Sequence, residues 1–184
     1  MFRTSVSLDE FMRISLDPAN ADRRLQRIDG EIVEYLSSNH ASQIAATLTC
    51  EVGIFVRQHK LGYMTGADCG YTISGEQYIA DGAFVSYERE SENPSEYYPD
   101  APPNLVIEVL SLHVGGLDER EKLARKVANY LAAGCELWLV DPVEEKLERC
   151  LPNQPVRTYR NGDTLEGVGV LKGFKLEIRS IWPE

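Results

Sequence analysis

The chain has 184 residues, 43% of them hydrophobic and 26% charged, which suits a single globular domain over residues 1–184 and excludes a disordered chain. Its net charge of −10 argues against broad nonspecific binding of nucleic acid, but not against a local basic groove or a metal-neutralised site. No apolar run could cross a bilayer, and the first five residues lack the apolar stretch of a secretory signal, so we expect a cytoplasmic protein. The four cysteines form no CxxC pair, which disfavours a zinc site and favours free thiols.

The N-terminal segment predicts a helix followed by a strand. Ser7 and Glu10 form a capping box ahead of Phe11, which is typical of a helix start. After a turn at Asp29-Gly30, residues 31–35 alternate polar and apolar side chains, as a half-buried strand does.

The middle of the chain predicts one long helix and two strands. Apolar residues recur at helical spacing from about residue 40 to residue 60. Residues 71–73 and 77–86 are predicted strands, separated by a turn at Gly75. The acidic, proline-bearing stretch over residues 88–103 is a predicted surface loop.

The second half predicts a parallel strand–helix–strand unit. Residues 105–110 are almost continuously apolar, the pattern of a strand covered on both faces. A helix over residues 117–133 follows, ended by Gly134, and residues 136–140 form another buried strand. Two strands joined by a helix run parallel, so we expect a mixed α/β fold. The glycine-rich remainder predicts short antiparallel strands.

Two acids stand inside these apolar segments. Glu108 is the lone carboxylate of residues 105–110, and an unpaired buried carboxylate needs a metal, a cation or a proton. The alternative is a buried ion pair or a strand face open to solvent. Asp81 lies within an apolar strand of its own, although Asp-Gly is also a common turn pair. Two carboxylates on adjacent strands would supply the hard oxygen ligands that Mg²⁺ or Mn²⁺ prefers.

Lys126 belongs to the helix that follows the Glu108 strand. It falls at the edge of the helix's apolar stripe, from which its ammonium could reach the end of that strand. The alternative is an ordinary solvated lysine. Glu31 and His40, taken alone, are surface or capping residues, and His113 lies in a glycine-rich loop just past the strand end. The sequence contains no HExxH, GxGxxG, GxxxxGK[ST] or GxSxG motif.

Taken together, these motifs resemble the putative restriction endonuclease family that is abundant in cyanobacteria, a branch of the PD-(D/E)XK nuclease superfamily. The resemblance covers most of the chain and rests on the order and content of residues 28–34, His40 with Ile44, and residues 80–85, 105–111, 126–130 and 133–142. It implies a restriction endonuclease-like core with a mixed sheet and extra N- and C-terminal β elements.

The resemblance also assigns roles. Asp81 matches the Asp of the PD element and Glu108 the acid of the second element, so both are expected to bind metal together with the carbonyl of Val109. Lys126 matches a lysine supplied from the following helix, and Glu31 matches an acid near the site. The implied activity is Mg²⁺-dependent endonucleolytic hydrolysis of DNA, with Mn²⁺ as a substitute metal. A homodimer is compatible with action on duplex DNA.

The chain agrees with the family at one notable position and departs from the family pattern at two places. The family usually lacks the lysine that the superfamily has two residues after the second acid, and this chain has Leu110 there. Ala80 replaces the usual proline and Gly82 a β-branched residue, and the usual Ser-Pro-Ser after the second strand is Ser111-Leu112-His113. Two alternatives to a nuclease therefore stay open: a nuclease-like fold that serves as a catalytically inactive binding or assembly module, and a domain that binds a small molecule or a protein, whose carboxylates form structural ion pairs.

Overall fold

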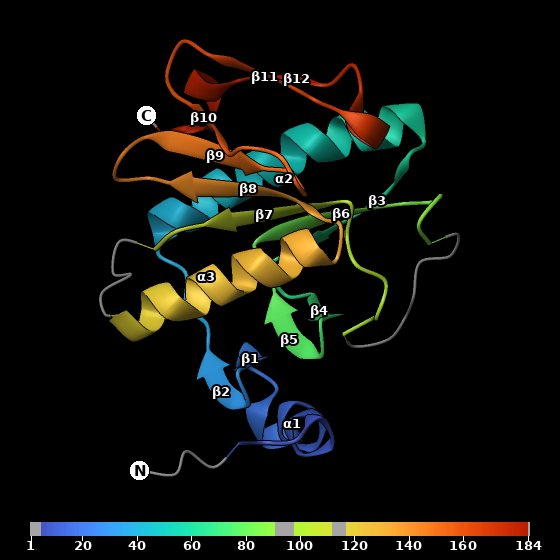
Figure 1. Ribbon diagram of the computed structural model, residues 1–184, viewed down its shortest axis with the longest axis vertical. Helices are drawn as coiled ribbons and strands as arrows, with labels where there is room; N and C mark the ends of the chain where they lie inside the picture. The colour runs from blue at the N-terminus through green and yellow to red at the C-terminus, as the bar shows by residue number, and fades with distance from the viewer. Residues whose placement is uncertain (1–4, 91–97, 112–116, 184) are drawn as a thin grey trace.

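The computed structural model describes residues 5–90, 98–111 and 117–183, with the backbone alone at 117–119 (Figure 1). His113 and part of the predicted 88–103 loop lie outside the described residues. A six-stranded mixed sheet and a four-stranded antiparallel sheet carry the site, and smaller elements are added at both ends of the chain. The fold class predicted from the sequence, an α/β core with extra N- and C-terminal β elements, is confirmed.

The larger sheet has six strands in the order β10-β9-β8-β7-β6-β3. Its central strands β7 and β8 run parallel, as predicted, and the other neighbours are antiparallel. The strands are β3 (Gly62–Gly66), β6 (Gly82–Ser86), β7 (Leu105–Val109), β8 (Glu136–Asp141), β9 (Lys146–Cys150) and β10 (Arg157–Tyr159).

Helices cover both faces of β7, which explains its apolar sequence. Along β7, Ile107 and Val109 belong to a core shared with α2 (Asn39–His59), whereas Val106 belongs to a core shared with Tyr130 of α3 (Leu117–Ala132). Because neighbouring residues of a strand point to opposite faces, Glu108 is on the α3 face. Gly134 ends α3 in the left-handed conformation, φ 78°, as expected of a helix C-terminal glycine.

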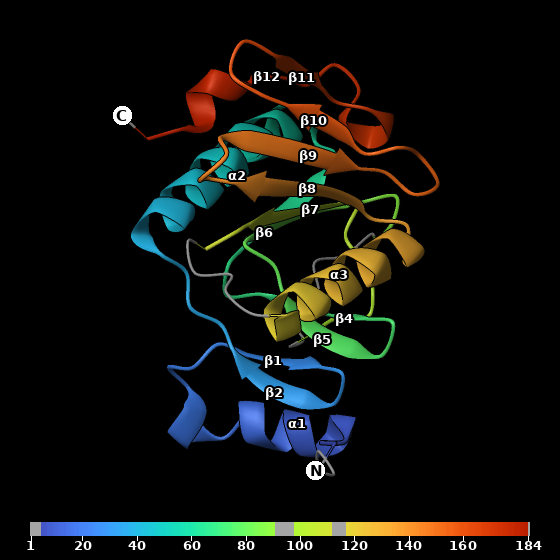
Figure 2. The same cartoon turned by 60° about the vertical axis from the view of Figure 1, so that its left-hand side comes forward.

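A second, four-stranded sheet lies beside α3 and has the order β2-β1-β5-β4 (Figures 1 and 2). Its strands are β1 (Leu25–Ile28), β2 (Glu31–Glu34), β4 (Gly70–Ile73) and β5 (Glu76–Ile79). Ser7 is the N-cap of α1 (Leu8–Ser15), as the predicted capping box requires, since its hydroxyl accepts a hydrogen bond from the Glu10 N–H.

The prediction of one strand over residues 77–86 is wrong. The segment forms two strands in different sheets: β5 pairs with β1 and β4, and β6 pairs with β3 and β7. Asp81 lies in the bend between β5 and β6 rather than inside a strand, and its N–H donates to the carbonyl of Ile107. The two sheets therefore diverge at Asp81, which places this carboxylate at their junction.

The C-terminal segment adds the strand pair β11 (Thr164–Glu166) and β12 (Lys175–Glu177), at the end of the molecule opposite β1 and β2 (Figure 2). The 3₁₀ turns η1 (Pro18–Asn20), η2 (Gly169–Leu171) and η3 (Ile178–Ile181) complete the order of elements. Within the described ranges, no helix combines the length and the apolar character needed to span a membrane.

Candidate active site

Glu108 is buried on β7 and bound to two side chains of α3. Only 6% of the residue is exposed. Its Oε1 lies 2.8 Å from Lys126 Nζ and accepts a hydrogen bond from the Tyr130 hydroxyl at 3.0 Å, while Oε2 lies 3.0 Å from the same Nζ. The expectation that Glu108 needs a buried partner is met by a cation and a hydroxyl.

Lys126 is as buried as its partner, with 6% of the residue exposed. Besides Glu108, its ammonium donates to the carbonyl of Ile79 at the end of β5, 2.9 Å away. The rings of Tyr35, Tyr78 and Tyr130 stand about the ammonium, with centroids 5.8 to 6.0 Å from Nζ. The alternative of a solvated lysine is therefore wrong: Lys126 ties α3 to both sheets.

Asp81 is held by one hydroxyl and one backbone amide. Its Oδ1 accepts from the Tyr35 hydroxyl at 2.8 Å, and Oδ2 accepts from the Val109 N–H at 2.8 Å. The β6–β7 ladder begins only at Gly82 and Ile107, so Val109 lies beyond it. In a strand the N–H and C=O of one residue point to the same side, so the Val109 carbonyl also faces the Asp81 side of β7.

The electrostatics of the site are unbalanced. Burial raises the pKa of Glu108 to about 7, against the lowering effect of Lys126, and the nearby Asp81 carboxylate raises it further. Burial also raises the pKa of Asp81, although the Val109 amide and the Tyr35 hydroxyl oppose this. Two carboxylates thus share one ammonium at low dielectric, so the fully ionised cluster carries one excess negative charge.

The hydroxyls that contact the carboxylates stay protonated. Burial, followed by the charge of Asp81, raises the pKa of Tyr35, and burial followed by the charge of Glu108 raises that of Tyr130 well above its usual value. Both phenols are therefore hydrogen-bond donors throughout the physiological pH range, and they fix the orientation of the two carboxylates.

A cavity of about 290 Å³ opens beside Glu108 and Lys126. Its lining also includes Gln26, Tyr35, Val109 and Lys122, among others. Glu31 faces this side of β2 and forms an ion pair with Lys122 at 3.4 Å. The predicted acid Glu31 is thus near the cluster, at its rim rather than within it. His40 lies in the first turn of α2, and no contact joins it to the cluster in the described part of the chain.

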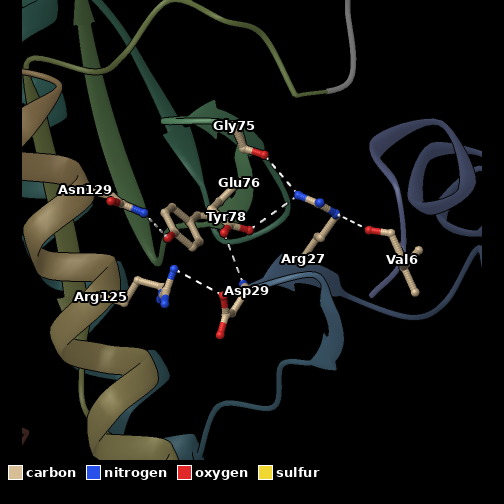
Figure 3. Close-up of polar contacts among 8 residues, drawn as sticks. All are labelled: Val6, Arg27, Asp29, Gly75, Glu76, Tyr78, Arg125 and Asn129. Atoms are coloured by element: carbon tan, nitrogen blue, oxygen red, sulfur yellow. Dashed lines mark hydrogen bonds and ion pairs between the residues drawn. The ribbon is translucent and has the colours of Figure 1, made fainter. Parts of the chain in front are cut away.

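A polar network fixes the small sheet against α3 (Figure 3). Arg27 of β1 donates to the carbonyl of Gly75 at 3.0 Å and lies 3.5 Å from Glu76. Across the gap, Arg125 of α3 pairs with Asp29 at 3.2 Å. The remaining bonds of the network join Arg27 to Val6, Asp29 to Glu76, and Asn129 to Tyr78. This network holds β5 and α3 in the positions from which Ile79 and Lys126 meet.

Sequence reasoning did not identify three polar residues of this site. Tyr35 and Tyr130 were assigned to a strand and to an apolar helix stripe, and their hydroxyl contacts depend on tertiary placement. Gln26 is only 3% exposed, and its Oε1 accepts a hydrogen bond from the Ile79 N–H at 3.1 Å. Because Arg27 follows Gln26 in β1, nothing in the sequence indicated that this glutamine is buried.

The donor set is compatible with a small divalent cation. In the described residues no group of three His, Cys, Asp or Glu side chains could hold a metal ion. Mg²⁺ does not require such a group, because it is commonly bound by one or two carboxylates and keeps several waters. Each oxygen of Asp81 accepts one hydrogen bond in the contacts above, which leaves lone pairs available, and the excess negative charge favours a cation.

Comparison with known proteins gives the family. The profile of the Uma2 family, described as putative restriction endonuclease, matches residues 8–179. The chain belongs to the Uma2 family. This confirms the resemblance drawn from the sequence. The structure of this Uma2 protein is similar to the crystal structure of a putative nuclease belonging to DUF820 from Anabaena variabilis, with a TM-score of 0.79. The two sequences are 16% identical, and the match covers 96% of this chain and 97% of the other. No curated protein matched.

Proposed function

We propose that this protein is a divalent-metal-dependent nuclease that hydrolyses phosphodiester bonds in DNA. Membership in Uma2 and the nuclease-like fold support the reaction class. The observation that carries the proposal is the buried cluster of Asp81, Glu108 and Lys126, in which burial raises the pKa of Glu108 to about 7 despite an ammonium 2.8 Å away. Such a cluster gains from a bound cation.

Asp81 and Glu108, with the carbonyl of Val109, would hold Mg²⁺, or Mn²⁺ in its place. When bound, the metal would offset charge on the scissile phosphate and lower the pKa of a bound water. Tyr35 and Tyr130 keep the carboxylate oxygens oriented by donating to them. Cation binding requires Glu108 to be ionised, so metal affinity should fall as the pH drops below about 7.

Lys126 would stabilise the negative charge that develops on the phosphate. Its ammonium already lies in a buried position between Glu108 and Ile79. A fixed cation in a site of low dielectric costs little reorganisation during the reaction. Leu110 cannot supply this charge, so Lys126 of α3 would take the role that a lysine at position 110 has in the superfamily.

The test is cleavage of supercoiled plasmid in Mg²⁺ and in Mn²⁺. We expect Glu108→Gln to abolish metal-dependent nicking and Glu177→Gln, the same change on the exposed strand β12, to leave it intact. Gel filtration or circular dichroism must first establish that both variants fold. Cleavage by a folded Glu108→Gln protein at the wild-type rate would reject the assignment. Dimerisation stays a prediction, to be measured by sedimentation of the same samples.

A second function, a binding or assembly module without catalysis, is favoured by one specific observation. Every carboxylate oxygen of Asp81 and Glu108 already has a partner within the protein. If these contacts meet the hydrogen-bonding needs of both carboxylates, the Glu108–Lys126 ion pair is structural and the cluster needs no metal. Calorimetric titration with Mn²⁺ separates the two readings, because an inactive module would show no binding at millimolar metal while staying folded.

A further inference from the structure

We propose that a single nucleic-acid strand, on one side of the bond to be cleaved, runs along a groove between helix α2 and edge strand β3. This inference rests on the proposed function, which it deepens by naming how the substrate lies. The groove consists of two cavities that meet at Cys50, a residue that lines both.

The first cavity begins at Asp81 and has a volume of about 410 Å³. Arg24, Ser42 and Thr49 line it, and of these Arg24 offers a cation and Ser42 a hydroxyl. The Thr49 hydroxyl is buried and has no hydrogen-bond partner. The Arg24 side chain is 43% exposed, and its ion-pair partner within the described residues is the almost fully exposed Asp68, at 3.2 Å, so the ion pair is weak and the guanidinium can turn to a phosphate.

Gly82 makes this arrangement possible. A Cβ at this position would lie 2.4 Å from the Thr49 hydroxyl oxygen, so the Thr49 side chain or the backbone would have to shift. The glycine that replaces the family's usual β-branched residue thus lets Thr49 of α2 approach the backbone beside Asp81. The Thr49 hydroxyl therefore lies buried against the Gly82 backbone, and the polar groups open to the first cavity are those of Arg24 and Ser42.

The second cavity continues the groove and has a volume of about 560 Å³. Arg57 and Lys60 line it, together with Tyr63 and the half-exposed Tyr87. Small residues shape the floor: Gly53 lies in the second cavity, and Gly66 in the first, where a Cβ would meet nothing within 4 Å. Small residues leave room for a sugar–phosphate backbone, and the exposed Tyr87 offers a face on which a base can stack.

The charged residues that line the groove favour a polyanion as its ligand. The whole chain carries a net charge of −10, yet among the described residues that line the two cavities Asp81 is the sole acid, against Arg24, Arg57 and Lys60. A basic track with aromatic faces on an otherwise acidic protein fits a polyanion. The two cavities, of about 560 and 410 Å³, lie between one helix and one edge strand and are too small for a duplex, so they fit a single strand.

The test measures binding of fluorescein-labelled oligothymidylate by anisotropy, in EDTA and over a range of salt concentrations. The groove variant combines Arg57→Gln with Lys60→Asn, because Lys60 has φ 53°, a conformation that asparagine tolerates. The control combines Lys172→Asn with Arg179→Gln, two exposed cations near the C-terminus, so both variants lose the same net charge.

We expect the groove variant to reduce the slope of log affinity against log salt by roughly 1.4, about 0.7 for each lost phosphate contact, and the control to leave it unchanged. Tyr87→Ala should weaken binding on the order of tenfold through lost stacking. Bound oligonucleotide should also slow alkylation of the exposed Cys50 by N-ethylmaleimide, but not that of the half-buried Cys69 outside the groove.

Three results would overturn the inference: no binding by the wild type, equal losses in the groove and control variants, or unprotected Cys50 at saturating oligonucleotide. A dimer in sedimentation that only the groove variant dissociates would assign the groove to a second copy instead. Because EDTA removes metal and turnover, binding is scored independently of cleavage. If the protein cleaves DNA but the groove variant binds oligonucleotide as well as the control does, the groove proposal fails and the nuclease proposal stands. If the protein binds oligonucleotide through the groove but never cleaves DNA, only the nuclease proposal fails.

Discussion

Replacement of Glu108 by glutamine should change how the stability of the metal-free protein depends on pH. Burial raises the pKa of Glu108 from 4.5 to about 7, so between these values the folded protein keeps a proton that the unfolded chain has lost. The stabilisation is therefore complete below about pH 4.5 and is lost as the pH rises to about 7. From about pH 5 to about pH 8 the loss amounts to roughly 2–3 kcal/mol.

Glutamine keeps the shape of Glu108 but does not titrate, so the loss of unfolding free energy that Glu108 causes between about pH 5 and about pH 8 should vanish. Urea unfolding followed by circular dichroism at several pH values, with EDTA present, measures the effect. Relative to the wild type, Glu108→Gln should gain roughly 2–3 kcal/mol between about pH 5 and about pH 8, or about 5–10 °C in Tm. Glu177→Gln on exposed β12 is the control and should run parallel to the wild type. Parallel curves for Glu108→Gln as well would refute the claim that the cluster is electrostatically unbalanced.

Three further changes test the parts of the site. Lys126→Met should reduce metal-dependent cleavage by roughly a hundredfold or more, measured as single-turnover nicking, since a fixed positive charge at the phosphate is lost; an unchanged rate would place the charge elsewhere. Tyr130→Phe removes a donor that lowers the pKa of Glu108, so the midpoint of Mn²⁺ binding against pH, measured by calorimetry, should move to higher pH. Gly82→Ala should cost about 1–3 kcal/mol in urea unfolding, because its Cβ would meet the Thr49 hydroxyl oxygen at 2.4 Å, and a second change, Thr49→Ala, should restore most of that loss.

The regular elements could be predicted because their signals are local. The cap at Ser7, the helical spacing over α2 and the doubly covered strand β7 each depend on a few neighbouring residues, and all three are present. The strand over residues 77–86 was wrong for the opposite reason. Apolar residues stand on both sides of Asp81, and the Asp-Gly turn pair was the one local sign of the break; the pairing of β5 and β6 with different partners separates the two strands at Asp81.

The candidate site likewise has residues that a local sequence signal indicated and residues that it did not. Glu108 was conspicuous because a carboxylate in an apolar strand has few explanations. The hydroxyls of Tyr35 and Tyr130, and the link from Gln26 through Ile79 to Lys126, join elements that are remote in the chain. No spacing encodes such contacts, because tyrosine and glutamine in a strand or helix stripe are equally compatible with packing alone.

The central claim is that Asp81 and Glu108 hold one divalent cation between them. Anomalous scattering from crystals soaked in Mn²⁺ tests it most directly. We predict one peak within bonding distance of both carboxylates and of the Val109 carbonyl, at about 2.1 Å as for Mg²⁺. No peak between the two acids at saturating Mn²⁺, with Glu108 still bound to Lys126, would contradict the claim.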